Sequence, residues 1–191
     1  LLELGAGDAT LMLRVARALK PRWSGVQLAL LDRVDLLDAK TRAGYAAIGW
    51  TATPNTMDVL DWTREQEGEG AAARSEEPLW DLVIANLFLH HFEAKELQAL
   101  LAAVARRSSA FVACETRRSG FALAASHGIG ALGTGPVTRA DAVTSVRAGF
   151  SGQELSALWP PNAGWVLTER PAGLFSHCFR AERSAAAAAP G

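Results

Sequence analysis

Apolar residues along the chain fall into two kinds of segment, and the two kinds alternate. One kind is a short uninterrupted apolar run, which is typical of a parallel strand buried on both faces. The other kind carries apolar residues three or four positions apart, which is typical of a helix with one buried face. Short, mostly apolar runs occupy residues 1–4, 26–31, 82–85 and 110–114, and residues 50–53 are predicted as a further short strand. Strands separated by helices predict a doubly wound α/β fold with a mostly parallel sheet.

Helical spacing fills most of the intervals between these runs. Leu11, Val15 and Leu19 recur every four residues and predict an apolar stripe on a helix that ends before Pro21. Further helices are predicted over residues 34–48, 92–107 and 151–159, the last with a capping box of Ser151 and Glu154 at its start.

The remaining segments are less regular. Residues 165–168 and 174–180 predict an antiparallel hairpin that turns at 169–173. The segments without a clear period are 57–62, predicted as a loop; 63–79, predicted as a mobile insertion rich in Glu, Gly and Ala; 117–150, broken by glycines; and 183–191, predicted as a flexible Ala-rich tail.

Composition narrows the class of protein. The chain has 19 basic and 20 acidic residues and a net charge of −1, so no overall basic field points to a nucleic-acid partner, which weakens that interpretation without excluding it. No apolar run is long enough to span a bilayer and no secretory signal precedes the strands, so we expect a cytoplasmic protein without a membrane span. Cys114 and Cys178 are predicted as reduced packing residues.

The 191 residues are enough for one domain with a sizeable core, which we place over residues 1–182. The first residues already read as a strand, and no Met precedes them. We therefore expect this domain to be truncated at its N-terminus.

Polar residues follow the predicted strands at one edge of the sheet. Doubly wound sheets bind ligands at this edge, beyond the carboxyl ends of their strands. The sequence therefore predicts a ligand site there. The residues concerned are Gly5, Gly7, Asp32, Asp58, Asn86, His90, His91 and Glu115.

Gly5 and Gly7 form the turn between the first strand and the first helix. Glycines allow the backbone to approach a ligand closely, and the start of the helix presents free N–H groups. A dinucleotide fingerprint would need a third glycine, but Thr10 stands at that position. The turn indicates a nucleotide-like ligand and matches the dinucleotide pattern incompletely.

Residues 3–9, with a glutamate two positions before the first glycine, resemble the first motif of the class I S-adenosylmethionine-dependent methyltransferases. Asp32, Asp58 and the stretch DLVIANLFLHHF at 81–92 resemble further motifs of that family, in the same order. The resemblance covers residues 1–180 and is to the small-molecule type, similar to the ubiquinone- and menaquinone-biosynthesis-like enzymes. It implies a Rossmann-like seven-stranded sheet of order 3-2-1-4-5-7-6 with the last strand antiparallel.

The resemblance implies S-adenosylmethionine as methyl donor and S-adenosylhomocysteine as product. In this family the glycine turn approaches the methionine portion and the ribose. Asp32 would accept hydrogen bonds from both ribose hydroxyls, and Asp58 would accept one from the adenine amino group beside the N–H of Val59. The cofactor-binding residues implied in this way are Glu3, Gly5, Ala6, Gly7, Asp32, Arg33, Asp58, Val59, Asn86 and Leu87.

Methyl transfer from a sulfonium is an in-line displacement, so the protein must align the acceptor with the methyl group and exclude water. A hydroxyl acceptor must also lose a proton, which a histidine can take near neutral pH. His90 and His91 are the candidate catalytic residues, and the resemblance favours His91 as the one that faces the substrate. The alternative is that both only line the pocket. His127 and His177 are predicted as ordinary surface and strand histidines, and no metal site is predicted.

The acceptor is expected beside the fifth strand and the segment 117–150. An arginine there can bind a carboxylate or a phenolate. The apolar stretch 121–132 favours a hydrophobic or aromatic acceptor. The candidate substrate-binding residues are Glu115, Arg117 and Arg147.

The sequence thus predicts transfer of a methyl group from S-adenosylmethionine to a small hydrophobic or aromatic acceptor, at oxygen. Two alternatives stay open: a noncatalytic subunit that binds the cofactor and, less favoured, a nucleotide-dependent oxidoreductase. Nucleic-acid methylation is a weaker variant. The Asn/Asp-Pro-Pro-aromatic signature of base N-methylation is absent after the fourth strand, where residues 86–89 read NLFL. The sequence makes no prediction of the oligomeric state.

Overall fold

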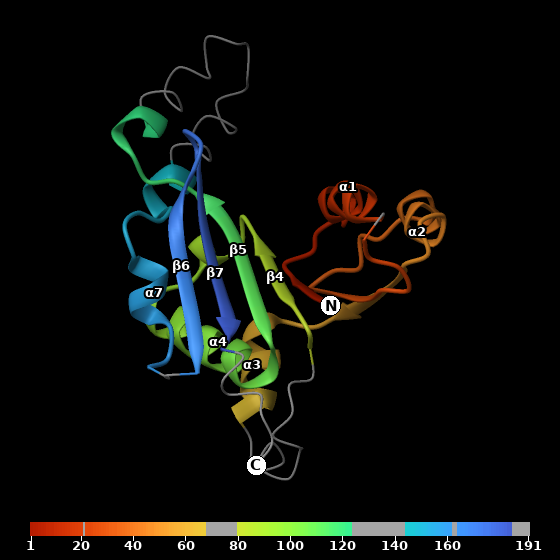
Figure 1. Cartoon of the computed structure of the whole chain (residues 1–191), viewed down its shortest axis with the longest axis horizontal. Helices are drawn as coiled ribbons and strands as arrows, with labels where there is room; N and C mark the ends of the chain where they lie inside the picture. Colours follow the sequence, from red (N-terminus) through yellow and green to blue (C-terminus); the bar gives the residue numbers. More distant parts are fainter. Residues whose placement is uncertain (21, 68–79, 124–143, 162–163, 185–191) are drawn as a thin grey trace.

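The computed structural model describes residues 1–20, 22–67, 80–123, 144–161 and 164–184. The strands in these residues are β1 (Leu2–Leu4), β2 (Gln27–Asp32), β3 (Thr51–Thr56), β4 (Val83–Asn86), β5 (Ala110–Thr116), β6 (Trp165–Ala172) and β7 (Ser176–Arg183). They form one seven-stranded sheet of order β3-β2-β1-β4-β5-β7-β6 (Figure 1). β1 to β5 pair in parallel, and β7 runs antiparallel to both β5 and β6. The predicted fold class, strand order and antiparallel last strand are confirmed.

Helices cover both faces of this sheet. They are α1 (Thr10–Leu19), α2 (Ala39–Ala46), α3 (Val59–Glu67), α4 (Ala94–Arg107) and α7 (Glu154–Leu158), with a 3-10 turn η2 (Leu89–His91) after β4. α1 and α2 lie on one face beside the first strands, and α3, α4 and α7 lie on the other (Figure 1). None of these described helices is long and apolar enough to cross a membrane.

Each face of the sheet carries its own hydrophobic core. Leu2 and Leu4 of β1 belong to the larger core, together with residues of α3, α4 and α7. Leu28 and Leu30 of β2 belong to the smaller core under α1 and α2, whereas the next residue, Leu31, belongs to the larger one. β2 is therefore buried on both faces over residues 28–31, as the apolar residues there predict.

α1 lies where it is predicted, but it buries a different stripe. Leu11 and Val15 are 46% and 41% exposed, so the predicted stripe is wrong. The buried face of α1 carries Met12, Leu13 and Ala16 instead. These residues also recur three to four positions apart, so the apolar spacing alone permits either face.

Two helices begin at aspartates. α2 begins at Ala39 and not at residue 34, because the Asp38 carboxylate accepts the backbone N–H of Thr41 at 2.6 Å. α3 begins directly after Asp58, whose Oδ1 accepts the backbone N–H of Leu60 at 2.8 Å. The predicted loop at 57–62 is therefore wrong from residue 59 onward.

The predicted mobile segment 63–79 begins inside α3. Thr63 and Gln66 are buried, and each side chain donates a hydrogen bond to the carbonyl four residues earlier. The prediction is wrong for residues 63–67, and residues 68–79 lie outside those that the structure describes.

Two strands continue through prolines. β3 includes Pro54 and β6 includes Pro171. Both strands are at an edge of the sheet, where a residue without an N–H is tolerated. The third strand therefore runs to Thr56, and the hairpin turn follows Ala172 and does not begin at residue 169 as predicted.

The hairpin carries a buried contact between a histidine and a carboxylate. Nε2 of His177 lies 2.8 Å from Oε1 of Glu169, and neither side chain is exposed. The Glu169 carboxylate also accepts the backbone N–H groups of Leu155 and Ser156 in α7, at 3.1 and 2.7 Å. His177 is a strand histidine, as predicted, and the pair joins the hairpin to α7. His127 lies outside the described residues.

The last strand extends into the predicted tail 183–191. Arg183 ends β7, and its guanidinium donates to the backbone oxygens of Ser108 and Ala105 at 2.9 and 3.0 Å. The same group lies 5.1 Å from the ring centroid of Trp165. Residues 185–191 lie outside the described part of the chain.

Cys114 and Cys178 face each other across β5 and β7, with their Sγ atoms 3.5 Å apart. Both are free thiols of intermediate burial. Burial and the neighbouring thiol raise the pKa of Cys114 to about 11, so this thiol stays protonated at neutral pH.

Candidate active site

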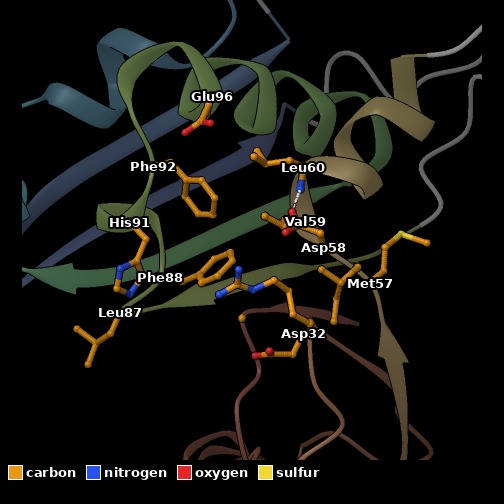
Figure 2. Close-up of a pocket in the computed structure, with 13 residues that line it drawn as sticks. Asp32, Met57, Asp58, Val59, Leu60, Leu87, Phe88, His91, Phe92 and Glu96 are labelled. Carbon is orange, nitrogen blue, oxygen red and sulfur yellow. Dashed lines mark hydrogen bonds between the residues drawn. The ribbon is translucent and has the colours of Figure 1, made fainter.

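A cleft of about 570 Å³ opens at the carboxyl ends of the parallel strands. Figure 2 shows its side chains converging on this edge of the sheet. A second cavity, of about 790 Å³, lies at the opposite edge of the sheet and contains none of the predicted site residues. The residues that line the first cleft are Gly5, Leu31, Asp32, Arg33, Met57, Asp58, Val59, Leu60, Leu87, Phe88, His91, Phe92 and Glu96.

The cleft brings together most of the predicted cofactor-binding residues. Ala6 and Gly7 line a small hollow on another side of Asp32. Glu3 is buried in β1, and Asn86 ends β4 without lining the cleft. The predicted residues that do line it are Gly5, Asp32, Arg33, Asp58, Val59 and Leu87.

The turn after β1 takes the left-handed conformation that its glycines allow. Gly5 and Gly7 have φ angles of +65° and +53°. The backbone N–H of Gly5 donates to the carbonyl oxygen of Leu31 at 2.9 Å, which joins the turn to the end of β2. A Cβ atom on Gly5 would lie 2.2 Å from the ring of Phe88. The missing side chain at Gly5 therefore allows Phe88 to pack directly on the turn.

We expect Gly5→Ala to lower the free energy of unfolding by about 2 kcal/mol more than Gly173→Ala, because only the first change forces a side chain into a packed ring. Both glycines have positive φ, but nothing lies within 4 Å of a Cβ on Gly173. Urea denaturation of both variants measures the difference. Equal losses would contradict the packing of Phe88 on the turn.

Asp32 links the glycine turn to the end of β2. Its Oδ2 accepts the backbone N–H of Gly7 at 2.9 Å, and its Oδ1 accepts the N–H of Val34 at 3.4 Å. A carboxylate oxygen can accept two hydrogen bonds. Asp32 therefore keeps acceptor capacity toward the cleft.

Asp58 lies on the opposite wall, at the start of α3 (Figure 2). Its contact with the N–H of Leu60 fixes the carboxylate beside the first helical residue, Val59. The positive end of the helix dipole is directed at the same place. This corner offers a carboxylate and helix N–H groups to a polar ligand.

Glu3 is buried beneath the glycine turn. Burial, with a smaller contribution from the charge of Asp8, raises the pKa of Glu3 to about 8. Its Oε2 is buried and has no hydrogen-bond partner among the residues that the structure describes. Glu3 is therefore mostly protonated at pH 7 and has unused hydrogen-bonding capacity.

The segment after β4 is held by Glu115 of β5. Oε1 of Glu115 accepts the backbone N–H groups of Phe88 and Leu89, both at 2.9 Å. Oε2 lies 2.8 Å from Nδ1 of His90, and the side chains of His90 and Glu115 are 6% and 0% exposed. Leu87, just before, has a φ of +50°, a strained conformation that this anchoring stabilises.

Glu115 therefore has its acceptor atoms directed at the protein. We predicted it as an acceptor contact, and the geometry makes it a residue that positions His90 and the segment after β4.

His91 lines the cleft, unlike His90. Its ring lies edge-on to Phe88, with centroids 6.5 Å apart, and 4.2 Å from the ring of His90. Burial, followed by the proximity of His90, lowers the pKa of His91. His91 is therefore mostly neutral at pH 7.

The cleft also contains aromatic residues that were not predicted as site residues. Phe88 and Phe92 pack edge to face, with centroids 5.0 Å apart. Both belong to the stretch DLVIANLFLHHF, but apolar residues just after a buried strand are usually core residues. The contacts of Phe88 with Gly5 and with His91 could not be predicted from the spacing of residues in the sequence. Leu31, Met57, Leu60 and Glu96 complete the lining and were likewise missed.

The predicted acceptor-binding arginines are placed apart. The backbone N–H of Arg117 donates to the carbonyl of Phe175 at 2.7 Å, and its Nη1 donates to that of Gly173 at 3.3 Å. Arg147 is exposed in the helical residues 144–148. Neither arginine lines the cleft. Residues 124–143 of the predicted acceptor segment lie outside the described residues.

No protein-family model matches the chain, and no significant match was found among curated proteins. Solved structures do match. One is LepI in complex with S-adenosylmethionine, at 16% identity and a TM-score of 0.53, over 96% of this chain and 42% of that one. Another is magnesium protoporphyrin IX methyltransferase from Synechocystis PCC 6803 with bound S-adenosylmethionine, at 13% and 0.53, over 96% and 69%.

A third match is the mitomycin 7-O-methyltransferase, at 16% identity and a TM-score of 0.57, over 96% of this chain and 48% of that one. The chain thus spans less than half the length of two of these three proteins. At such identities the likeness establishes the fold: the chain has the fold of the S-adenosylmethionine-dependent methyltransferases.

Proposed function

We propose that this chain transfers a methyl group from S-adenosylmethionine to a hydroxyl of a small hydrophobic or aromatic acceptor. The observation that carries the proposal is the cleft itself. It gathers the glycine turn, Asp32 and Asp58, and His90 with Glu115 stands beside it.

The polar groups of the cleft favour one orientation of the cofactor, with its adenine at Asp58 and its methionine portion at Gly5. Asp58 and the first turn of α3 suit the adenine, and the free acceptor capacity of Asp32 suits the ribose hydroxyls. The methionine portion then lies at Gly5 and Leu87, beside the unpartnered Oε2 of Glu3. In support of this arrangement, six of the ten predicted cofactor-binding residues line the cleft, and Ala6 and Gly7 line the adjacent hollow at Asp32.

When bound, S-adenosylmethionine supplies an electrophilic methyl group. The chain's own residues must then align the acceptor oxygen and remove its proton. We assign proton removal to His90. Its Nδ1 is held by Glu115, which leaves Nε2 as the free nitrogen, and a carboxylate that orients an imidazole is a common arrangement for a general base.

Position also favours His90 over His91. His90 contacts Glu115 of β5, and Arg117 and Phe121 come shortly after β5 in the chain. His91 lines the wall of the cleft that we assign to the cofactor. We therefore propose His90 as the base and His91 as part of the cofactor pocket, which reverses the order that the resemblance favours.

The acceptor is proposed to lie beyond β5. Phe121 and Phe175 are 58% and 52% exposed, and their rings are in contact, with centroids 5.8 Å apart and planes tilted by 38°, so they offer an aromatic surface there. Arg117 and Arg147 remain candidates for an anionic group on the acceptor. The names of two matched proteins, which specify magnesium protoporphyrin IX and mitomycin, are in keeping with a small-molecule acceptor and, in the second case, with oxygen as the methylated atom.

Calorimetry followed by a transfer assay tests the proposal. Wild-type protein is expected to bind S-adenosylhomocysteine and not NADH, and to transfer a labelled methyl group to at least one member of a panel of simple phenols and aromatic acids. Binding without transfer to any acceptor would favour the noncatalytic alternative. Binding of NADH alone would favour the oxidoreductase alternative and overturn the proposal.

A further inference from the structure

Two thiols face each other across β5 and β7, which lie side by side in the sheet (Figure 1). Cys114 and Cys178 are direct partners in the antiparallel register of these strands, and their Sγ atoms are 3.5 Å apart. Directly paired antiparallel residues have Cα atoms about 4.5 to 5.5 Å apart, which is within the range that a disulfide spans. The two thiols are therefore placed for an intrachain disulfide.

The face of the sheet that carries the two thiols is accessible to a small reactant. Val112 of β5 and Arg180 of β7 are the next residues on this face, and both line the cavity of about 790 Å³. Cys114 and Cys178 are themselves only of intermediate burial. A small oxidant such as hydrogen peroxide can therefore reach the sulfur atoms.

The backbone at Cys114 supports the proposed active site. Its carbonyl oxygen accepts the N–H of Leu87, a residue that lines the cleft, at 2.9 Å. The next residue, Glu115, contacts His90. The thiol itself points away from Glu115, because successive residues of a strand face opposite sides of the sheet. A bond between the two sulfur atoms would therefore act on the site through the backbone of β5.

We propose that Cys114 and Cys178 form a modification site at which hydrogen peroxide makes a reversible disulfide, and that this bond lowers the activity of the neighbouring site. One thiolate attacks a peroxide oxygen, which releases hydroxide and leaves a sulfenic acid, and the second sulfur then displaces hydroxide from that acid. The two thiol protons convert the two hydroxides to water. Each sulfur loses one electron, and the peroxide gains both.

The effect on activity rests on the proposed function. Formation of the bond shortens the Sγ–Sγ distance from 3.5 Å to about 2.05 Å. Rotation of the two side chains absorbs part of this movement, and the backbone of β5 takes up the rest. Since misplacement of a catalytic group by about 1 Å can cost about 100-fold in rate, this smaller shift is expected to lower kcat about tenfold.

Mass spectrometry of the folded protein after treatment with hydrogen peroxide tests the disulfide. The chain contains no other cysteine, so the bond is expected to remove the mass of two hydrogen atoms and to join Cys114 to Cys178 in a peptide digest. Dithiothreitol is expected to reverse the change. The pKa of Cys114 is raised to about 11, and the thiolate is the attacking form, so the reaction is expected to be faster at pH 9 than at pH 7. Sulfinic and sulfonic acids alone, or disulfides between two chains alone, would overturn the inference.

Cys178→Ser is the matched control for the effect on activity, because it keeps Cys114 and removes its partner. The untreated variant is expected to keep the wild-type kcat and to retain it after peroxide, whereas wild-type protein loses activity that dithiothreitol restores. Oxidation of Met57 in the cleft would affect both proteins alike, so an equal loss in both would overturn the effect of the disulfide. Untreated wild-type protein that transfers no methyl group would overturn the proposed function and the effect on activity, whereas the mass measurement would still decide whether the disulfide forms.

Discussion

Asp32→Ala is expected to weaken the binding of S-adenosylhomocysteine by about 30-fold to several hundred-fold, because it removes two charge-assisted hydrogen bonds to the ribose. The carboxylate is half-buried at the end of β2 and is already oriented by the N–H of Gly7. Little ordering is therefore required when the ribose binds, and the hydrogen bonds contribute nearly their full strength to affinity. Calorimetry on the folded variant measures the loss.

Two further variants separate the role of the charge from the role of the turn. Asp32→Asn keeps an acceptor for Gly7 and removes the charge, so its affinity is expected to lie between those of Asp32→Ala and the wild type. Asp35→Ala is the matched control, because Asp35 also accepts a backbone N–H two residues later, at 3.0 Å from Leu37, but does not line the cleft. Unchanged affinity in Asp32→Ala, or an equal loss in Asp35→Ala, would contradict the ribose assignment.

The strand pattern carried most of the information about the fold. Residues 28–31 are all apolar because both faces of this part of the strand are covered, and this burial requires helices on both faces of the sheet. Helix faces were less predictable. In α1 both Leu11 and Met12 are apolar, and only the shape of the sheet beneath decides that Met12 is buried.

Helix and strand ends depend on single polar contacts. Asp38 starts α2, which the apolar spacing predicted to begin at residue 34, and Asp58 starts α3, which the apolar spacing did not predict. Aspartate is a preferred residue at the start of a helix, so both starts could have been predicted from the sequence. Pro54 and Pro171 were predicted to lie outside strands, but a strand at the edge of the sheet can include them. The prediction could not tell an edge strand from a central one at those positions.

The site also contains residues that could be predicted from the sequence and residues that could not. Residues at strand ends, such as Asp32 and Asp58, could be predicted because topology brings all these ends to one edge. The pairing of His90 with Glu115 could not be predicted, because the two residues are 25 positions apart in the sequence. Which of the two adjacent histidines contacts Glu115 depends on how the 3-10 turn η2 is rotated. The packing of Phe88 on Gly5 likewise depends on the strained conformation of Leu87.

The catalytic assignment predicts unequal effects for the two adjacent histidines. With an acceptor found by the transfer assay, His90→Gln is expected to lower kcat by about 10²- to 10⁴-fold, the usual contribution of a general base. His91→Gln is the matched control and is expected to lower kcat less than fivefold. In His90→Gln the affinity for S-adenosylhomocysteine is expected to stay within threefold of the wild type, which separates proton removal from cofactor binding. His91→Gln changes the cofactor pocket, so its affinity is expected to fall, and its kcat is compared at saturating cofactor.

Glu115→Gln extends the test to the residue that positions His90. The amide oxygen can still accept the N–H groups of Phe88 and Leu89, so the segment after β4 keeps its anchor, but the negative charge beside His90 is lost. An imidazole that takes a proton in the transition state is stabilised by that charge, so kcat is expected to fall about 10- to 100-fold with cofactor affinity unchanged.

A larger loss of kcat in His91→Gln than in His90→Gln would instead assign the base to His91. Unchanged kcat in both histidine variants would mean that alignment of the acceptor with the methyl group, without a histidine base, accounts for the catalysis.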